Sequence, residues 1–418
     1  METVENLISG QRRHRIVSNS HMKIVLIQPE VPQSEDEEFL GIYPPLGLAW
    51  LAGNVKGHDL QVLDLRCDPL DIEEWDVVGI SCQTVSLENC TELAQKIRDE
   101  LPEAVIITGG HHPVPQELLD FSDYVVRGEG ELTFAELLCH LKGSAKKIQS
   151  IPGVTSHKRT SPDRSPANLT LLNPPNYHVI SLKKYYPNQG TMVTSRGCPY
   201  HCVFCISPFG HTWRGRTPSQ VITEAEILLQ KGASCLHIMD DLFTYDRKRV
   251  FKICEGFHSL HALWDLPNGT RVDTVDQAML NTMAESGCTR ILYGVESGVE
   301  DVLQKIRKQT TPQEIEETVE LTKNAGIEVE GLFMVGNPGD TPQTVKKTVE
   351  FIKKLDIKGH FSLATPYPGT AFWKWVKTHG KFLNIPYEDF ERIPVFETPD
   401  FSAEERLSML EWASEECR

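Results

Sequence analysis

Residues 195–205 read Ser-Arg-Gly-Cys-Pro-Tyr-His-Cys-Val-Phe-Cys, which places Cys198, Cys202 and Cys205 in a C-x3-C-x2-C spacing. Thiolates are soft ligands that suit iron–sulfur clusters, and three of them on one loop can hold three irons of a cubane. The fourth iron then has no protein ligand and can chelate a substrate, whereas a cluster with four protein thiolates carries electrons. The spacing therefore predicts a [4Fe–4S] cluster with an open iron.

A structural zinc site is the competing interpretation of this loop. It would need a fourth ligand, such as His201 or His211, and zinc sites usually combine two separate C-x2-C pairs. The sequence has no second pair. The remaining cysteines lack ligand spacing, and we interpret most of them as small buried hydrophobes, which argues against an auxiliary cluster: Cys67, Cys82, Cys90, Cys139, Cys235, Cys254, Cys288 and Cys417.

Short apolar runs alternate with helical stretches on the C-terminal side of this loop. Six such strand–helix units are too few for a closed eight-stranded barrel and predict an open, partial (β/α)6 TIM-like barrel. The functional site of such a barrel lies at the C-terminal ends of its strands. The predicted strands are 192–195, 235–239, 266–268, 290–294, 328–334 and 360–364.

The N-terminal part alternates in the same way and predicts a doubly wound, Rossmann-like parallel sheet. Its expected strands are 23–27, 60–63, 77–81, 104–108 and 124–126. Glycine-rich or hydroxyl-bearing loops follow most of them and should lie on one sheet edge, where backbone can approach a flat ligand closely. These loops are 44–47, 81–84, 109–113 and 128–131.

The chain divides into five predicted segments. We expect residues 1–21 to be a leader or a cloning remnant, 22–142 the first domain, 143–189 a linker, 190–372 the barrel and 373–418 a short helical cap. The net charge of −16 and the pI near 5.4 argue against a nucleic-acid surface. No apolar run is long enough to span a membrane, and an odd number of scattered cysteines fits the reducing cytoplasm.

The quoted loop resembles the cluster loop of radical S-adenosylmethionine (SAM) enzymes, and the resemblance extends through the predicted barrel. It implies that the open iron binds the amino and carboxylate groups of SAM, whose cleavage gives a 5′-deoxyadenosyl radical. Each supporting motif follows a predicted strand: 240–241, 270–273, 293–298, 336–341 and 366–370.

The same resemblance implies roles for residues near the cluster. Phe204 would lie beside the adenine, and Asp240 and Asp241 near the methionine amino group. The sequence departs here from the commoner Gly-Gly-Glu pattern, because Met239 precedes the two aspartates.

Three more residues are expected at the other end of SAM. Glu296 and Ser297 would lie near its carboxylate or ribose, and Arg271 is the remaining candidate for the carboxylate. The alternatives are structural: an ion pair between Arg271 and Asp273 on the barrel rim, and a helix N-terminal position for the Glu296 carboxylate.

The N-terminal unit resembles the cobalamin-binding domain that is joined to one large radical SAM subfamily. It lacks Asp-x-His-x-x-Gly, the motif that supplies a histidine to cobalt, so we expect the lower face of cobalt to be empty or bound by water or a non-histidine group. The residues expected to bind cobalamin are Pro45, Leu46, Gly47, Ser81, Gln83, Thr84, Gly109, Gly110, His111, Gly128, Glu129 and Gly130.

Two cofactor signatures in one chain lead to the hypothesis of a cobalamin-dependent radical methyltransferase that acts on an unactivated carbon of a small molecule or natural product. The alternatives are a radical cyclisation, ring contraction or rearrangement without methyl transfer, and a non-catalytic cobalamin-binding sensor. Because no auxiliary cluster is expected, electrons should come from an external reductant such as a flavodoxin or ferredoxin.

Overall fold

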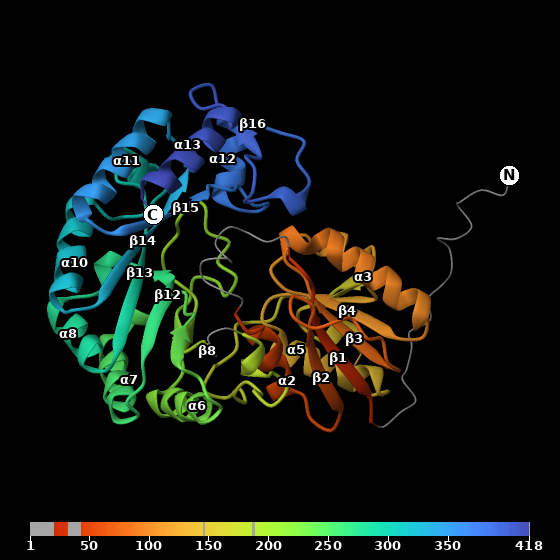
Figure 1. Ribbon diagram of the computed structural model, residues 1–418. Helices are drawn as coiled ribbons and strands as arrows, with labels where there is room; N and C mark the ends of the chain where they lie inside the picture. The colour runs from red at the N-terminus through yellow and green to blue at the C-terminus, as the bar shows by residue number, and fades with distance from the viewer. Residues whose placement is uncertain (1–20, 32–42, 145–146, 186–188, 418) are drawn as a thin grey trace.

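Two parallel sheets, one from each half of the chain, dominate the computed structural model (Figure 1). The structure describes residues 21–31, 43–144, 147–185 and 189–417. The expected leader, apart from its last residue, lies outside the described residues. Among the described residues, no helix combines the length and the apolar character needed to cross a membrane.

The N-terminal sheet has the strand order β2-β1-β3-β4-β5-β6-β7, and its first five strands are parallel. Alternate residues of each strand face opposite helix layers, so the strands are nearly continuous apolar runs. Helices α2 and α5 cover one face, and α3 and α4 cover the other. The bounds are β1 Lys23–Gln28, α2 Leu46–Asn54, β2 Asp59–Asp64, β3 Val77–Ser81, α3 Leu87–Glu100, β4 Val105–Gly109, α4 Pro115–Leu119, β5 Tyr124–Val126 and α5 Gly130–Leu141.

The segment expected to be a linker extends this sheet. Strand β6 (Val154–Ser156) pairs antiparallel with β5, and β7 (Arg159–Thr160) pairs antiparallel with β6. The chain then runs between the two sheets to the barrel, and Tyr185 donates a hydrogen bond to Asp64 at 2.8 Å. The expected segment boundaries stay predictions.

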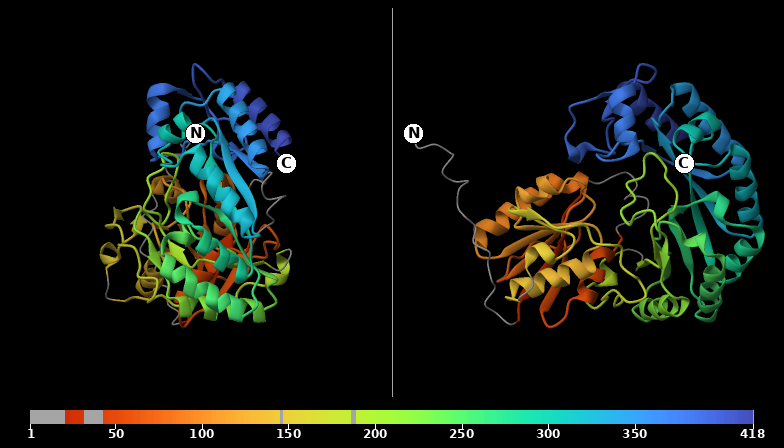
Figure 2. Two further views of the ribbon diagram at one scale, coloured as in Figure 1. Left: turned by 90° about the vertical axis from the view of Figure 1, so that its left-hand side faces the viewer. Right: turned by 180° about the vertical axis from the view of Figure 1, so that it is seen from behind.

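The second sheet has the order β15-β14-β13-β12-β11-β8, and all of its strand pairs are parallel. Its helices lie in an arc along the outer side, as the view from behind shows (Figure 2, right). The sheet curves without closing, as expected for a partial barrel. The bounds are β8 Gln189–Met192, α6 Pro218–Gln230, β11 Cys235–Ile238, α7 Arg247–Ser259, β12 Trp264–Thr270, α8 Gln277–Glu285, β13 Cys288–Glu296, α9 Glu300–Lys305, α10 Pro312–Asn324, β14 Glu328–Val335, α11 Pro342–Leu355 and β15 Lys358–Leu363.

Three of the outer helices start with the same local signal. Thr217, Thr311 and Thr341 are the N-caps of α6, α10 and α11, and a proline follows each of them. Each threonine side chain accepts a hydrogen bond from the backbone N–H three residues later. The side chain of that later residue in turn accepts a hydrogen bond from the backbone N–H of the threonine. These N-terminal caps determine the residue at which each of the three helices begins.

The C-terminal cap connects the barrel to the N-terminal domain. Its short helix η7 packs against η2 (Thr84–Ser86) and α3, and the Tyr387 ring lies 5.6 Å from the ring of His112. Helix α13 packs on α11 and β15 at the other end of the cap. The bounds are α12 Ala371–His379, β16 Lys381–Phe382, η7 Tyr387–Asp389, β17 Phe396–Glu397 and α13 Ala403–Glu416.

Replacing Gly110 by alanine should destabilise the N-terminal domain by about 2–4 kcal/mol. Gly110 has a φ of +118°, and a Cβ there would lie 2.3 Å from the carbonyl oxygen of Cys82. Gly47→Ala is the control, because its Cβ would meet no atom within 4 Å; we expect a change of at most about 1 kcal/mol. Urea unfolding of both variants measures the difference, and equal stabilities would contradict the steric argument.

Candidate functional site

The three predicted cluster cysteines lie on one loop at the C-terminal end of β8. Cys198 and Cys202 are half-buried and Cys205 is exposed. Between them, the backbone of Val203 is held from two sides: its N–H donates to Ile306 O at 3.0 Å, and its carbonyl accepts from Phe372 N at 2.9 Å. The loop is therefore anchored to the barrel where it carries the thiols.

Two neighbouring carboxylates fix the start of this loop. Asp240 accepts hydrogen bonds from Thr194 N, Thr194 Oγ1 and Ser195 Oγ at 2.5–2.6 Å, and Asp241 accepts from Gly197 N at 2.6 Å. Gly197 is required because its φ is +85° and a Cβ would lie 2.3 Å from Thr212 O. Both aspartates thus support the loop, and their contact with the SAM amino group stays a prediction.

Arg271 forms the rim ion pair that the sequence analysis named as an alternative. Its Nε and Nη2 donate to Asp273 at 2.8 Å, and the guanidinium lies 3.6 Å from the centre of the Tyr200 ring. Its Nη1 is buried without a hydrogen-bond partner among the described residues. A buried donor of this kind needs an acceptor, which fits the carboxylate of SAM.

Lys308 is a site residue that the sequence analysis missed. Its Nζ donates to Glu296 at 2.8 Å, and both side chains are buried. Glu296, Arg307 and Gln309 all have positive φ values, of 69°, 57° and 59°. Left-handed backbone at non-glycine residues is costly and gathers at functional sites. No spacing in the sequence indicates this pair, because it depends on the fold of the loop.

The other predicted SAM residues are placed as follows. Phe204 is half-buried and packs on the barrel core. Ser297 is buried, and its hydroxyl lies 3.3 Å from Thr348 Oγ1 and accepts from Val299 N. Burial raises the pKa of the Cys202 thiol, while Lys308 and Arg271 oppose that rise. Phe204 thus lies on the cysteine loop itself, whereas the contacts of Ser297 are with Val299 and with Thr348 of α11.

A cavity of about 660 Å³ lies between the edge of the N-terminal sheet and the cluster loop. It is lined by every residue predicted to bind cobalamin except Thr84, whose hydroxyl lies 3.3 Å from His112 Nδ1. The barrel supplies the opposite wall: Thr191, Val193, Arg196, Ile206, Ser207, Pro208, Phe209 and Met239.

Two glycines of this cavity leave space for a broad ring. A Cβ on Gly47 or Gly128 would meet no atom within 4 Å, so any side chain there would occupy the cavity. His111 also lines it, and burial lowers the pKa of the His111 imidazole. His112 lines the cavity as well, and its Nε2 lies 2.8 Å from the carboxylate of Glu117. The cavity fits a flat, largely uncharged group such as a corrin.

Glu129 was predicted to bind cobalamin, but its carboxylate is engaged elsewhere. It accepts from Arg196 at 3.0 Å and from Arg214 at 2.6 Å, while Arg196 also donates to Glu131 at 2.5 Å. Arg196, Arg214 and Glu131 were not predicted as site residues. Arg196 belongs to the quoted cysteine motif, but no spacing in the sequence indicates its partner Glu129, 67 residues away.

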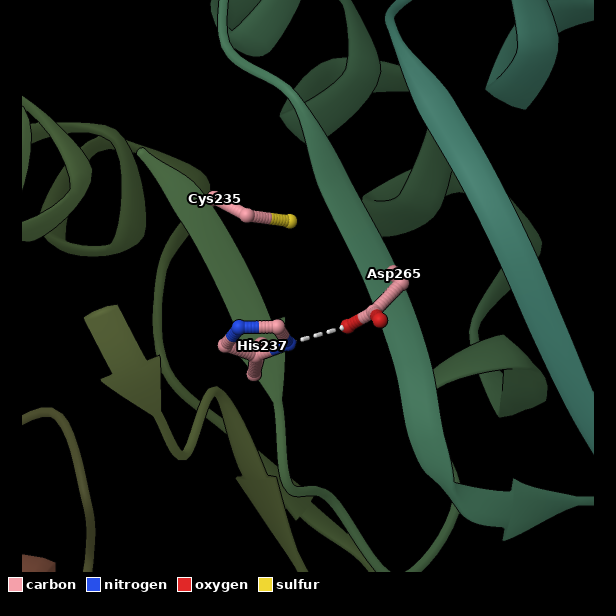
Figure 3. Close-up of side chains that lie close together, drawn as sticks. All are labelled: Cys235, His237 and Asp265. Atoms are coloured by element: carbon pink, nitrogen blue, oxygen red, sulfur yellow. Dashed lines mark hydrogen bonds and ion pairs between the residues drawn. The ribbon is translucent and has the colours of Figure 1, made fainter. Parts of the chain in front are cut away.

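A second group of metal-binding residue types lies near the N-terminal ends of β11 and β12. Figure 3 shows His237 pointing from β11 to Asp265 on β12, with Cys235 beside them. Their metal-binding atoms all lie within 4.8 Å of one another, and His237 Nδ1 is 2.7 Å from Asp265, which is a direct hydrogen bond. Arg290 also donates to Asp265 at 2.8 Å. These contacts favour a buried ion-pair layer over a metal site.

Comparison with known proteins agrees with this geometry. The profile of the radical SAM superfamily matches residues 192–352, and that of the B12-binding domain matches residues 37–138. An uncharacterized methyltransferase of Pyrococcus horikoshii is 31% identical over 93% of this chain and 91% of that protein. The cytidylyl-2-hydroxyethylphosphonate methyltransferase of Streptomyces wedmorensis is 27% identical over 78% of this chain and 75% of its own.

Among solved structures, the radical SAM methyltransferase TsrM of Kitasatospora setae, with cobalamin and a [4Fe–4S] cluster bound, has a TM-score of 0.73. The match is 19% identical in sequence and covers 88% of this chain and 82% of that one. This likeness shows a common fold.

The barrel and its three-cysteine loop define a radical SAM enzyme. The chain belongs to the family in which this barrel follows a B12-binding domain, and its similar relatives include methyltransferases. The predicted fold class, a Rossmann-like cobalamin-binding domain followed by a partial barrel, is confirmed. The predicted cofactors, a [4Fe–4S] cluster, SAM and cobalamin, are confirmed as well.

Replacing Cys202 by alanine should abolish the cluster, because the remaining two thiolates of the loop cannot hold three irons. Iron and sulfide content after anaerobic reconstitution, together with the visible spectrum, measures the loss. Cys139→Ala is the matched control, since Cys139 is exposed on the N-terminal domain. Equal iron content in the two variants would contradict the assignment.

Gly47→Phe should weaken cobalamin binding by about tenfold or more, because its ring would take up space inside the cavity. Gly47→Ala, which adds a single methyl group at the same position, should bind nearly as well as the wild type. Titration with hydroxocobalamin followed by its visible spectrum gives both dissociation constants. Unchanged affinity in Gly47→Phe would place the corrin elsewhere.

Proposed function

We propose that this enzyme transfers a methyl group from cobalamin to an unactivated carbon of a small-molecule substrate. The observation that carries the proposal is the shared cavity: its one wall is the glycine-lined sheet edge, and its other wall includes Ile206 and Phe209 of the cluster loop. A radical generated at the cluster and a methyl donor in the cavity would then act on one substrate carbon. The relatives include methyltransferases at 31% and 27% identity and anaerobic magnesium-protoporphyrin IX monomethyl ester cyclases at 26%, and the higher identity and coverage of the first two support methyl transfer over cyclisation.

When bound, the cluster with SAM would supply radical hydrogen abstraction and cobalamin would supply the methyl group, so the difficult chemistry would belong to the cofactors. The protein residues position and shield these groups. Cys198, Cys202 and Cys205 would hold three irons. Arg271 Nη1 and the Lys308–Glu296 pair would orient the amino acid end of SAM, and the apolar cavity wall would exclude water.

The partners are part of the same proposal. No second cysteine group lies near the cluster loop in the described residues, so an external reductant such as a flavodoxin or ferredoxin would supply electrons. A cluster with an open iron needs a reducing compartment, which favours the cytoplasm. The substrate would be a small molecule or natural product.

The proposal predicts two separable products when the reconstituted enzyme receives SAM with a deuterated methyl group and titanium(III) citrate. We expect release of 5′-deoxyadenosine and recovery of cobalamin that carries the deuterated methyl, both measured by mass spectrometry. Cys202→Ala should lose 5′-deoxyadenosine, and Gly47→Phe should lose only the methylated cobalamin. Release of 5′-deoxyadenosine without any methylation of cobalamin would exclude methyl transfer and favour the cyclase alternative.

A further inference from the structure

The cluster loop is a long loop, and a short antiparallel pair of strands joins its two ends. Strand β9 (Ser195–Arg196) and strand β10 (Arg214–Gly215) form this pair, and Arg196 lies directly opposite Arg214. The three cysteines lie between these two strands in the sequence. We call the β9–β10 pair the stem of the cluster loop, and its position determines where the cysteines lie.

Both stem arginines reach across to the N-terminal domain and meet at Glu129. Arg196 Nη1 donates to Glu129 Oε2 at 3.0 Å, and Arg214 Nη2 donates to Glu129 Oε1 at 2.6 Å. Arg196 Nη2 also donates to Glu131 at 2.5 Å. Two arginines and two glutamates therefore form one neutral ion-pair group, which joins residues 65 to 85 positions apart in the sequence.

The side chains of this four-residue group are largely buried, and Arg214 is the most exposed of them at 14%. The exposed fractions of the Arg196, Glu129 and Glu131 side chains are 4%, 8% and 5%. The Arg196 guanidinium also lies 4.8 Å from the Trp50 ring and 4.9 Å from the Phe209 ring. Ring contacts and ion pairs to two different glutamates leave the Arg196 guanidinium little freedom, and a lysine could not reproduce them.

Glu129 has an obvious alternative role that it does not perform. It is the N-cap residue of α5, yet its side chain makes no capping hydrogen bond. Because it also lines the cavity, it connects the wall of the corrin site with the stem of the cluster loop. A buried ion-pair group adds little stability compared with apolar packing, but it fixes geometry.

We infer that Glu129, Glu131, Arg196 and Arg214 are positioning residues that set the separation and orientation of the iron–sulfur cluster relative to the cobalamin. They act through the stem and the cavity wall rather than by binding either cofactor. The inference concerns the geometry between the two cofactors and needs no methyl acceptor, so it stands apart from the proposed reaction.

The test measures the distance between the two cofactors directly. Full-length enzyme is reconstituted with iron, sulfide and hydroxocobalamin and is then reduced to give a paramagnetic cluster and cob(II)alamin. Pulsed electron paramagnetic resonance on frozen samples gives the distribution of distances between the two spins. Iron content and the dissociation constant of hydroxocobalamin are recorded for the same samples, so that loss of a cofactor is not mistaken for displacement.

We expect one narrow distance distribution in the wild type and loss of that single distance in Glu129→Gln and in Arg196→Lys, with iron content and cobalamin binding retained. The double variant should match the single variants, because both changes break the same group. Lys184→Met is the control: it removes a partly exposed ion pair that joins Asp68 of the N-terminal domain to the segment before β8, and it should keep the narrow distance.

Two results would overturn the inference. A narrow, unshifted distance in Glu129→Gln would show that the group does not set the geometry. Loss of cobalamin affinity in Glu129→Gln alone, with the distance kept in Arg196→Lys, would make Glu129 a direct corrin ligand. If Glu129→Gln fails to fold, Arg214→Lys answers the same question, since it leaves Arg196 paired with both glutamates.

Discussion

The direction in which the chain leaves β8 depends on two adjacent carboxylates at the end of β11. Asp240 binds Thr194 and Ser195, and Asp241 binds Gly197. A buried carboxylate is costly unless its hydrogen bonds are made, so only a narrow range of loop conformations is acceptable. The positions of the cysteines and of the stem arginines depend on this first part of the loop. Both cofactor sites therefore depend on it as well.

The part of the site that the sequence predicts is the part that depends on local spacing. Three cysteines within eight residues and no second cysteine pair indicate an iron–sulfur cluster, and glycine-rich loops after parallel strands meet at one sheet edge. The alternation of strands and helices likewise gives both sheets. It misses β6 and β7, because their short polar sequences lack a strand pattern and are held by pairing to β5.

Contacts between distant segments are what the sequence could not give. Glu129 was assigned to the corrin from its loop, yet its carboxylate binds two arginines from the barrel. Lys308 was overlooked because only a loop with left-handed residues brings it to Glu296. The aspartates after β11 have a supporting role that no residue pattern distinguishes from ligand binding. In each case the deciding interaction joins residues whose spacing carries no signal.

The last helix has a consequence that concerns association rather than catalysis. Strand β15 ends the open sheet, and the outer side of such a strand offers unpaired backbone groups to any passing chain. Helix α13 packs across this strand, and Cys417 O accepts a hydrogen bond from Gly359 N at 3.1 Å. The cap thereby protects the sheet from intermolecular strand addition. Loss of α13 would expose the edge of β15, and its first effect would be aggregation.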